Sequence, residues 1–175
     1  METERLTLRR HRVTDLDDCV AMWADPRVTR HIGGRPFTAE EVWTKLLRYA
    51  GHWSLLGFGY WVVHENESGR FVGEVGFADF KRDLVPSLAG APELGWVLAP
   101  SAHGRGLGTE AVKAALAWAQ VHLDSPRTVC LIDPDNLPSL RVAEKCGYRE
   151  WCRTTYKQTP VILFERQGGH VRPSL

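Results

Sequence analysis

Three glycines at alternate positions, Gly104, Gly106 and Gly108, follow an apolar segment typical of a strand and precede one typical of a helix. Glycine has no Cβ, so its backbone N–H group can approach a bound anion closely. The first turn of a helix also presents N–H groups without intrahelical partners, and the helix dipole adds about half a positive charge there. This order of strand, glycine loop and helix predicts a phosphate or pyrophosphate site.

The spacing of these glycines argues against two common phosphate sites. A P-loop places Lys and then Ser or Thr after its last glycine, whereas Thr109 and Glu110 follow Gly108, so ATP is not the expected ligand. The dinucleotide fingerprint G-x-G-x-x-G needs its third glycine one position later, in an early βαβ unit. On this motif alone, a glycine-rich turn that binds no ligand stays open.

A second motif, DNLPSLRVAEKCGYRE at 135–150, makes the first one specific. Together they resemble the GNAT superfamily of N-acetyltransferases, in particular the branch containing the ribosomal-protein N-terminal (alanine) acetyltransferases. The outline matches from residue 5 to residue 166. The acetyl-CoA loop of the family, Q/R-x-x-G-x-G/A, is matched by His103, Gly104, Arg105, Gly106, Leu107 and Gly108. The pattern N-x-x-S-x-x-V/L-x-E-K-x-G-F/Y is matched by Asn136, Ser139, Val142, Glu144, Lys145, Gly147 and Tyr148.

Two positions depart from the family pattern. His103 stands where members carry Gln or Arg, and Ala143 stands where many carry the Tyr that protonates the leaving thiolate. The missing Tyr keeps open an alternative function, a non-catalytic acyl-CoA-binding sensor or interaction domain of the same fold. A nucleotide-phosphate binder of another fold is disfavoured because the P-loop Lys is missing.

The resemblance implies both a fold and a reaction. The fold is α/β, with a mixed, mostly antiparallel central sheet of about six to seven strands and helices on both faces. The reaction is transfer of the acetyl group of acetyl-CoA to a primary amine, by direct attack in a ternary complex. The backbone from Gly104 to Thr109 would bind the pyrophosphate, with the Arg105 side chain as a further contact. The amides of Trp96 and Leu98 would pair with pantetheine, where strand 94–98 splays from strand 129–132.

Four residues are candidates for the general base that accepts the proton of the attacking amine: Glu93, Glu74, Asp79 and His31. Glu93 is preferred, because members of the branch often carry an acidic residue just before the G-aromatic pair of this strand. Glu74 is the competing candidate for the base, because a carboxylate inside an otherwise apolar strand suggests a functional role. An ordinary surface role for Glu93 stays open.

Asn136 and Ser139 lie one helical turn apart, so their side chains share a helix face. If the resemblance holds, this face is directed at the cofactor, and the Ser139 hydroxyl hydrogen-bonds the leaving sulfur. Ser139 could instead satisfy only backbone N–H groups of the first turn, and Asn136 could be the helix N-cap. The cap and the cofactor contact can coexist.

Composition limits the other possibilities. The 175 residues predict one domain, residues 1–168, followed by a C-terminal tail, 169–175. A net charge of +1 gives no support for nucleic-acid binding.

The four cysteines form no C-x-x-C pair, so neither a metal nor a disulfide is expected. No apolar segment suggests a membrane partner or a targeting signal, which predicts a cytoplasmic protein. Both a monomer and a homodimer are possible.

The acceptor is the least specified part of the prediction, since both a protein N-terminus and a small-molecule amine fit. Segment 23–53 should select it. Three basic residues there, Arg27, Arg30 and Arg35, suggest an acceptor with an acidic or carbonyl group beside its amine.

The remaining elements follow from periodicity and turn signals. A strand is expected at 5–10, a helix from Thr14 to about 25, a hairpin of strands 58–63 and 71–80, and closing strands at 148–156 and 161–166. Thr38 and Glu41 form a capping box that predicts a helix start. The apolar stripe of that helix is Val42, Leu46, Tyr49, Trp53 and Leu56. Further helices are expected directly after the glycines, running to about residue 123, and at 136–146, the latter closed by Gly147.

Overall fold

A computed structural model describes residues 1–123 and 127–168; the predicted tail, 169–175, lies outside the described residues. The strands are β1 (Leu6–Arg10), β2 (Tyr60–Glu65), β3 (Phe71–Ala78), β4 (Glu93–Leu98), β5 (Arg127–Ile132), β6 (Arg149–Tyr156) and β7 (Thr159–Gln167). The α-helices are α1 (Leu16–Trp23), α2 (Pro26–Thr29), α3 (Ala39–Leu56), α4 (Leu107–His122) and α5 (Leu137–Lys145), and 3-10 turns lie at Val13–Asp15 and Pro100–Ala102.

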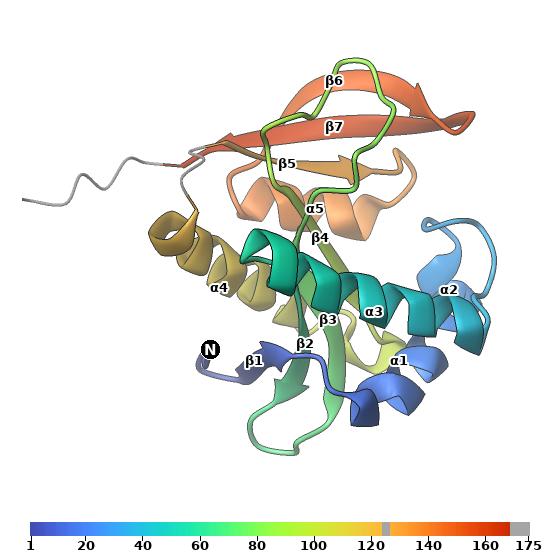
Figure 1. Cartoon of the computed structure of the whole chain (residues 1–175), viewed down its shortest axis with the longest axis vertical. Helices are drawn as coiled ribbons and strands as arrows, with labels where there is room; N and C mark the ends of the chain where they lie inside the picture. The colour runs from blue at the N-terminus through green and yellow to red at the C-terminus, as the bar shows by residue number, and fades with distance from the viewer. Residues whose placement is uncertain (124–126, 169–175) are drawn as a thin grey trace, which may run out of the picture.

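The strands form one seven-stranded sheet in the order β1-β2-β3-β4-β5-β7-β6 (Figure 1). The neighbours β4 and β5 are parallel, and the other five pairs are antiparallel. The prediction of a mixed, mostly antiparallel sheet is therefore confirmed. Within the described residues, no helix is long and apolar enough to cross a membrane.

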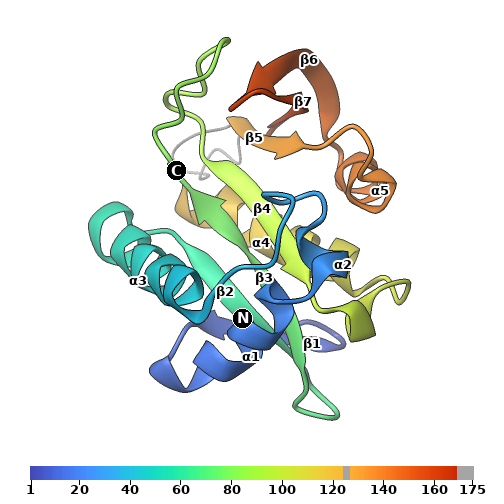
Figure 2. The ribbon, with the colours of Figure 1, turned by 90° about the vertical axis from the view of Figure 1, so that its right-hand side faces the viewer.

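Helices cover both faces of the sheet, as predicted. In Figure 2, α1, α2 and α3 lie in front of the sheet and α4 lies behind it. The two faces hold separate cores, because successive side chains of a strand point to opposite faces. On β4, Leu94 packs in the core that contains α4 and α5, and Val97 packs in the core with α1 and α3.

Helix α3 begins as its sequence predicts. The Thr38 side chain accepts from the Glu41 N–H, and the Glu41 carboxylate accepts from the Thr38 N–H. This reciprocal pair satisfies two backbone donors that a helix start leaves free. Of the predicted apolar stripe, Val42, Leu46 and Tyr49 are buried, whereas Leu56 in the last turn is 43% exposed. Trp53 packs against the core and donates from Nε1 to the Tyr60 carbonyl at 2.9 Å, so the helix contacts the sheet through all but its last turn.

Strands β4 and β5 diverge, which is the feature that positions the site. Their register contains a single pair, Glu93 with Val129, at the start of β4. The antiparallel pairing of β4 with β3, by contrast, continues along the whole strand, from Ala78–Glu93 to Gly73–Leu98. One edge of β4 is therefore paired throughout, and the edge toward β5 is open beyond its first residue.

Candidate active site

The open edge of β4 presents the backbone groups of Trp96 and Leu98. The Ala99 N–H donates to the Val72 carbonyl of β3 at 2.9 Å. Backbone groups in an antiparallel pair alternate between the two sides of a strand, so those of Trp96 and Leu98 are directed away from β3, toward β5. The imidazole of His103 donates from Nε2 to the Leu98 carbonyl at 3.0 Å. The Leu98 carbonyl is therefore already bonded within the protein, and the expected pairing of Trp96 and Leu98 with a pantetheine arm stays a prediction.

The glycine loop forms an open concave backbone at the start of α4. Gly104 and Gly106 adopt left-handed conformations, with φ of 73° and 77°. A Cβ placed on Gly104 would have no atom within 4 Å, so the space beside the loop is open. Gly106 is the N-cap of α4 and offers no side-chain acceptor to the first amides of the helix. Residues 103–106 are exposed, so the backbone of the loop before α4 is open to solvent.

Gly108 has a different role, because it lets α4 approach β4. An added Cβ there would lie 2.7 Å from Cδ1 of Leu98. Leu107, the first residue of α4, is wholly buried, and Thr109 is partly buried. The side chain of Leu107 is therefore not available to a ligand at the helix start.

Arg5 holds the loop in place, although no sequence motif points to it. Its Nη1 donates to the Arg105 carbonyl at 3.0 Å, and its Nε donates to Glu110 at 2.7 Å. The Arg105 guanidinium, expected as an additional ligand contact, pairs with Glu65 at the end of β2. Arg105 would have to leave this pair to reach a phosphate.

A cavity of about 620 Å³ opens beside the free edge of β4. It is bounded by β4, β5, the helices α3 and α5, and the loop after α2. Five residues considered at the sequence level line it: His31, Glu93, Trp96, Asn136 and Ser139. The glycine loop and Leu98 are not part of this lining, so the loop lies outside the cavity.

The start of α5 forms one wall of this cavity. Asn136 is the N-cap, and its Oδ1 accepts from the Ser139 N–H at 3.2 Å. The Ser139 hydroxyl has no hydrogen-bond partner among the described residues. Ala143, where many family members carry Tyr, is wholly buried in the core beside α4. A phenol at this position would have to displace that core packing.

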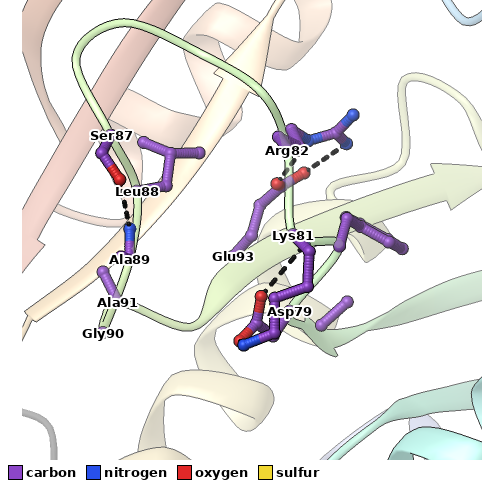
Figure 3. A pocket seen from close by; sticks show the side chains of 11 residues that line it. Asp79, Lys81, Arg82, Ser87, Leu88, Ala89, Gly90, Ala91 and Glu93 are labelled. Atoms are coloured by element: carbon purple, nitrogen blue, oxygen red, sulfur yellow. Dashed lines mark hydrogen bonds and ion pairs between the residues drawn. The ribbon is translucent and has the colours of Figure 1, made fainter.

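Glu93 is anchored by a bidentate ion pair. Its two carboxylate oxygens accept from Nε and Nη2 of Arg82, each at 2.7 Å (Figure 3). Burial opposes the charged guanidinium, but the bonds to Glu93 outweigh it and raise the pKa of Arg82. The pair lies between the large cavity and a smaller hollow of about 280 Å³ under the β3–β4 loop.

His31 is positioned by a carboxylate. Its Nδ1 lies 3.1 Å from Oδ2 of Asp133, just beyond the end of β5, and both residues line the cavity. A carboxylate on one ring nitrogen fixes the orientation of an imidazole and leaves the other nitrogen for a ligand. His31 is therefore a stronger candidate base than its sequence context alone indicated.

Glu74 is wholly buried on β3, and its surroundings explain a carboxylate in an apolar strand. It accepts from Trp23 Nε1 at 2.9 Å, lies 2.9 Å from His11 Nε2, and receives the Cys19 thiol at 3.4 Å. It does not line the large cavity. Asp79 is also outside this cavity and pairs with Lys81, which lowers the pKa of Asp79.

His11, Cys19 and Glu74 also offer ligand atoms within 4.8 Å of one another, a spacing that could hold a metal ion. No metal is expected from the sequence motifs, which cannot reveal this group because its three residues come from separate segments. All four cysteines of the chain are free thiols.

The arginines that suggested an acidic acceptor are not arranged around the cavity. Arg27 pairs with Asp25, and Arg35 pairs with Glu41, the capping residue of α3. The basic residues of the lining are instead Lys45, Arg48, Arg82 and Lys157. Sequence position alone did not identify them.

Comparison with known proteins identifies the family to which this chain belongs. The acetyltransferase (GNAT) domain profile matches residues 5–149, and the chain belongs to this family. The protein named "Uncharacterized N-acetyltransferase p20" of Bacillus licheniformis is 26% identical over 149 residues, 85% of this chain and 81% of that protein. The protein is thus an acetyl-CoA-dependent acetyltransferase.

Solved structures agree with this assignment. A putative GNAT-family acetyltransferase from Bordetella pertussis superposes with a TM-score of 0.83 at 32% identity, over 95% of this chain and 98% of that one. The ribosomal-protein-S5-alanine acetyltransferase of Vibrio fischeri shares the fold, with a TM-score of 0.74 at 18% identity, over 99% of this chain and 98% of that one. The predicted superfamily is confirmed, and a protein of the predicted branch is among its structural neighbours.

The loop geometry predicts that Gly106→Val lowers CoA affinity at least about tenfold. The new side chain would stand at the N-cap of α4, with its Cβ 3.6 Å from Nη2 of Arg5, and would narrow the approach of a pyrophosphate to the first amides of the helix. A β-branched residue at positive φ is also strained, so the matched control is Gly57→Val at the end of α3, where φ is 73°. Calorimetric titration should detect weak binding in Gly106→Val only. Equal affinities in two folded variants would contradict this role of the loop.

Proposed function

We propose that this acetyltransferase acts on a primary amine by direct attack in a ternary complex with acetyl-CoA. The observation that carries the proposal is the open edge of β4, which lies between the glycine loop and the cavity. One ligand lying along this edge would meet donors for a pyrophosphate at one end and Ser139 at the other. An extended, amide-containing arm that ends in a thioester fits this arrangement.

The cofactor-binding residues follow from this placement. The backbone of Gly104–Thr109 would hold the pyrophosphate through unpaired N–H groups and the α4 dipole. Trp96 and Leu98 would pair with the pantetheine amides, as a neighbouring strand does. Asn136 would flank the thioester end, and the contact of His103 with Leu98 keeps this ring beside the same edge.

Glu93 is the proposed general base. In the transfer, the C–N bond forms, the C–S bond breaks, and the amine must lose a proton. Each oxygen of Glu93 accepts one bond from Arg82 and keeps a second acceptor position, which can receive that proton directly or through water. The ion pair holds the carboxylate at a fixed position on the cavity wall, where an acceptor amine bound in the cavity can reach it.

Backbone and hydroxyl donors would stabilise the other charges of the reaction. An N–H group of Trp96 or Leu98 would donate to the carbonyl oxygen as it becomes negative, an effect of about 2.7–4 kcal/mol for one fixed donor. The Ser139 hydroxyl would donate to the leaving sulfur. Its freedom from other hydrogen bonds within the described residues supports this role.

We expect Glu93→Gln to lower kcat about 100-fold or more, with little change in CoA affinity, because Gln cannot accept the amine's proton. The control is Glu165→Gln, which changes a carboxylate that pairs with Arg127 away from the cavity lining. Release of CoA thiol with a panel of amines measures both. A silent Glu93→Gln with a strong loss in His31→Gln would assign the base to His31. No thiol release by the wild type, despite CoA binding, would favour a non-catalytic acyl-CoA-binding domain.

Ser139→Ala should slow the chemical step about 10- to 100-fold, because water can only partly replace a positioned donor. Ser139→Thr keeps a hydroxyl and should recover most of the rate. Single-turnover measurements separate this step from product release. A rate unchanged in Ser139→Ala would leave Ser139 with a structural role only and would assign thiolate protonation to water.

A further inference from the structure

One wall of the large cavity is basic. It carries Lys45 and Arg48 of α3 and Arg82 of the β3–β4 loop, which we call the basic wall. Lys45 and Arg48 lie three positions apart on α3, so they share one face of the helix. Arg82 is distant from them in sequence and lines the same cavity. None of them is explained by the cofactor-binding residues, which lie at the glycine loop, the β4 edge and the start of α5.

Lys45 is a partly buried ammonium that makes no ion pair within the described residues. Its Nζ lies 4.0 Å from the centre of the Trp23 ring and 4.8 Å from that of Phe37. Among the residues that the structure describes, no carboxylate lies within salt-bridge distance of it. Burial lowers the pKa of Lys45 to about 8, and the charge of Arg48 acts in the same direction. The nearby Glu74 partly opposes this, but its oxygens are bonded to Trp23 and other buried donors.

Arg48 and Arg82 are held by one aromatic ring. The guanidinium carbons lie 4.8 Å and 4.7 Å from the centre of the Phe80 ring. Such stacking fixes a guanidinium while leaving its N–H edge free for a ligand. Arg82 already pairs with Glu93, whereas Arg48 makes no ion pair within the described parts of the chain.

The acidic groups of the cavity do not offset this charge. The carboxylates in its lining are Glu93 and Asp133. Glu93 is bonded to Arg82 through both oxygens, and Asp133 contacts His31. The fourth cation of the lining, Lys157 on the β6–β7 turn, lies 5.5 Å from the centre of the Tyr156 ring. A polycationic acceptor would therefore meet like charges and find its counter-charges already paired.

We propose that the basic wall binds an acidic group of the acceptor, so that the preferred acceptor is a small amine that also carries a carboxylate. This inference rests on the proposed amine acetylation and specifies its substrate class. Lys45 and Arg48 bind the carboxylate, and the amine is then directed toward Glu93 on β4. The partly buried ammonium of Lys45, which makes no ion pair within the described residues, gains an anionic partner, and this gives the acidic acceptor an advantage over a neutral one.

The test uses acceptors that differ in one group. Each set contains an ω-amino acid, the amino alcohol of the same chain length and the corresponding diamine, and several chain lengths are compared. The amines within a set have similar basicity, so differences report the second group. In the wild type, kcat/KM measured by thiol release should be about tenfold or more higher for the amino acid than for the alcohol, and lowest for the diamine.

Variants assign this preference to the basic wall. In Lys45→Gln and Arg48→Gln, the preference for the amino acid over the alcohol should fall at least about fivefold, with CoA affinity unchanged. Arg153→Gln is the control, because it removes the same charge from an exposed position on β6 that is not part of the cavity lining. The control should keep the wild-type preference.

Two results would overturn the inference while leaving acetyl transfer intact. One is a diamine or alcohol acetylated as well as the amino acid, and the other is a preference that persists in both α3 variants.

If no amine releases thiol although CoA binds, the proposed function fails, and the basic wall is then tested by binding of an acidic amine. δ-Aminovalerate should then raise the melting temperature of the CoA-saturated wild type more than the amino alcohol does. An equal rise of the melting temperature in Lys45→Gln would also overturn the proposal that the basic wall binds the carboxylate.

Discussion

The divergence of β4 from β5 is the constraint on which the rest of the site depends. Neighbouring parallel strands normally exchange hydrogen bonds along their length. Here the register contains one pair, Glu93 with Val129, after which the edge of β4 faces a cavity. Apart from the Leu98 carbonyl, which accepts from His103, the backbone groups of this edge must be satisfied by solvent or by a ligand that lies along the strand, since unpaired buried groups are costly. A sheet closed at this point would have neither the slot nor the cavity.

Alternation along β4 then separates two environments. Leu94, Trp96 and Leu98 point toward α4 and α5, whose N-termini hold the glycine loop and Ser139. Glu93 and Val97 point toward α1 and α3, where Lys45 and Arg48 lie. Because the strand side chains have a period of two, one strand supplies a cofactor face and an acceptor face. The proposed reaction takes place where these faces meet, beside the strand.

Local signals in the sequence predicted much of this structure. The capping box at Thr38, the N-cap at Asn136 and the left-handed Gly147 each depend on a few adjacent residues, and the structure confirms all three. Contacts across the chain were not predictable in this way. His31 meets Asp133 across 102 positions, and the burial of Lys45 depends on the Trp23 ring of another helix. In the sequence, Lys45 is simply a polar position of an amphipathic helix.

A crystal structure of the protein with CoA would test the central claim most directly, namely that the open edge of β4 is the binding site for the acetyl donor. The account predicts the pyrophosphate on the N–H groups of residues 104–109. It predicts pantetheine amides paired with Trp96 and Leu98, and the sulfur within hydrogen-bond reach of the Ser139 hydroxyl. CoA bound away from this edge, with Trp96 and Leu98 contacting only protein or water, would contradict it.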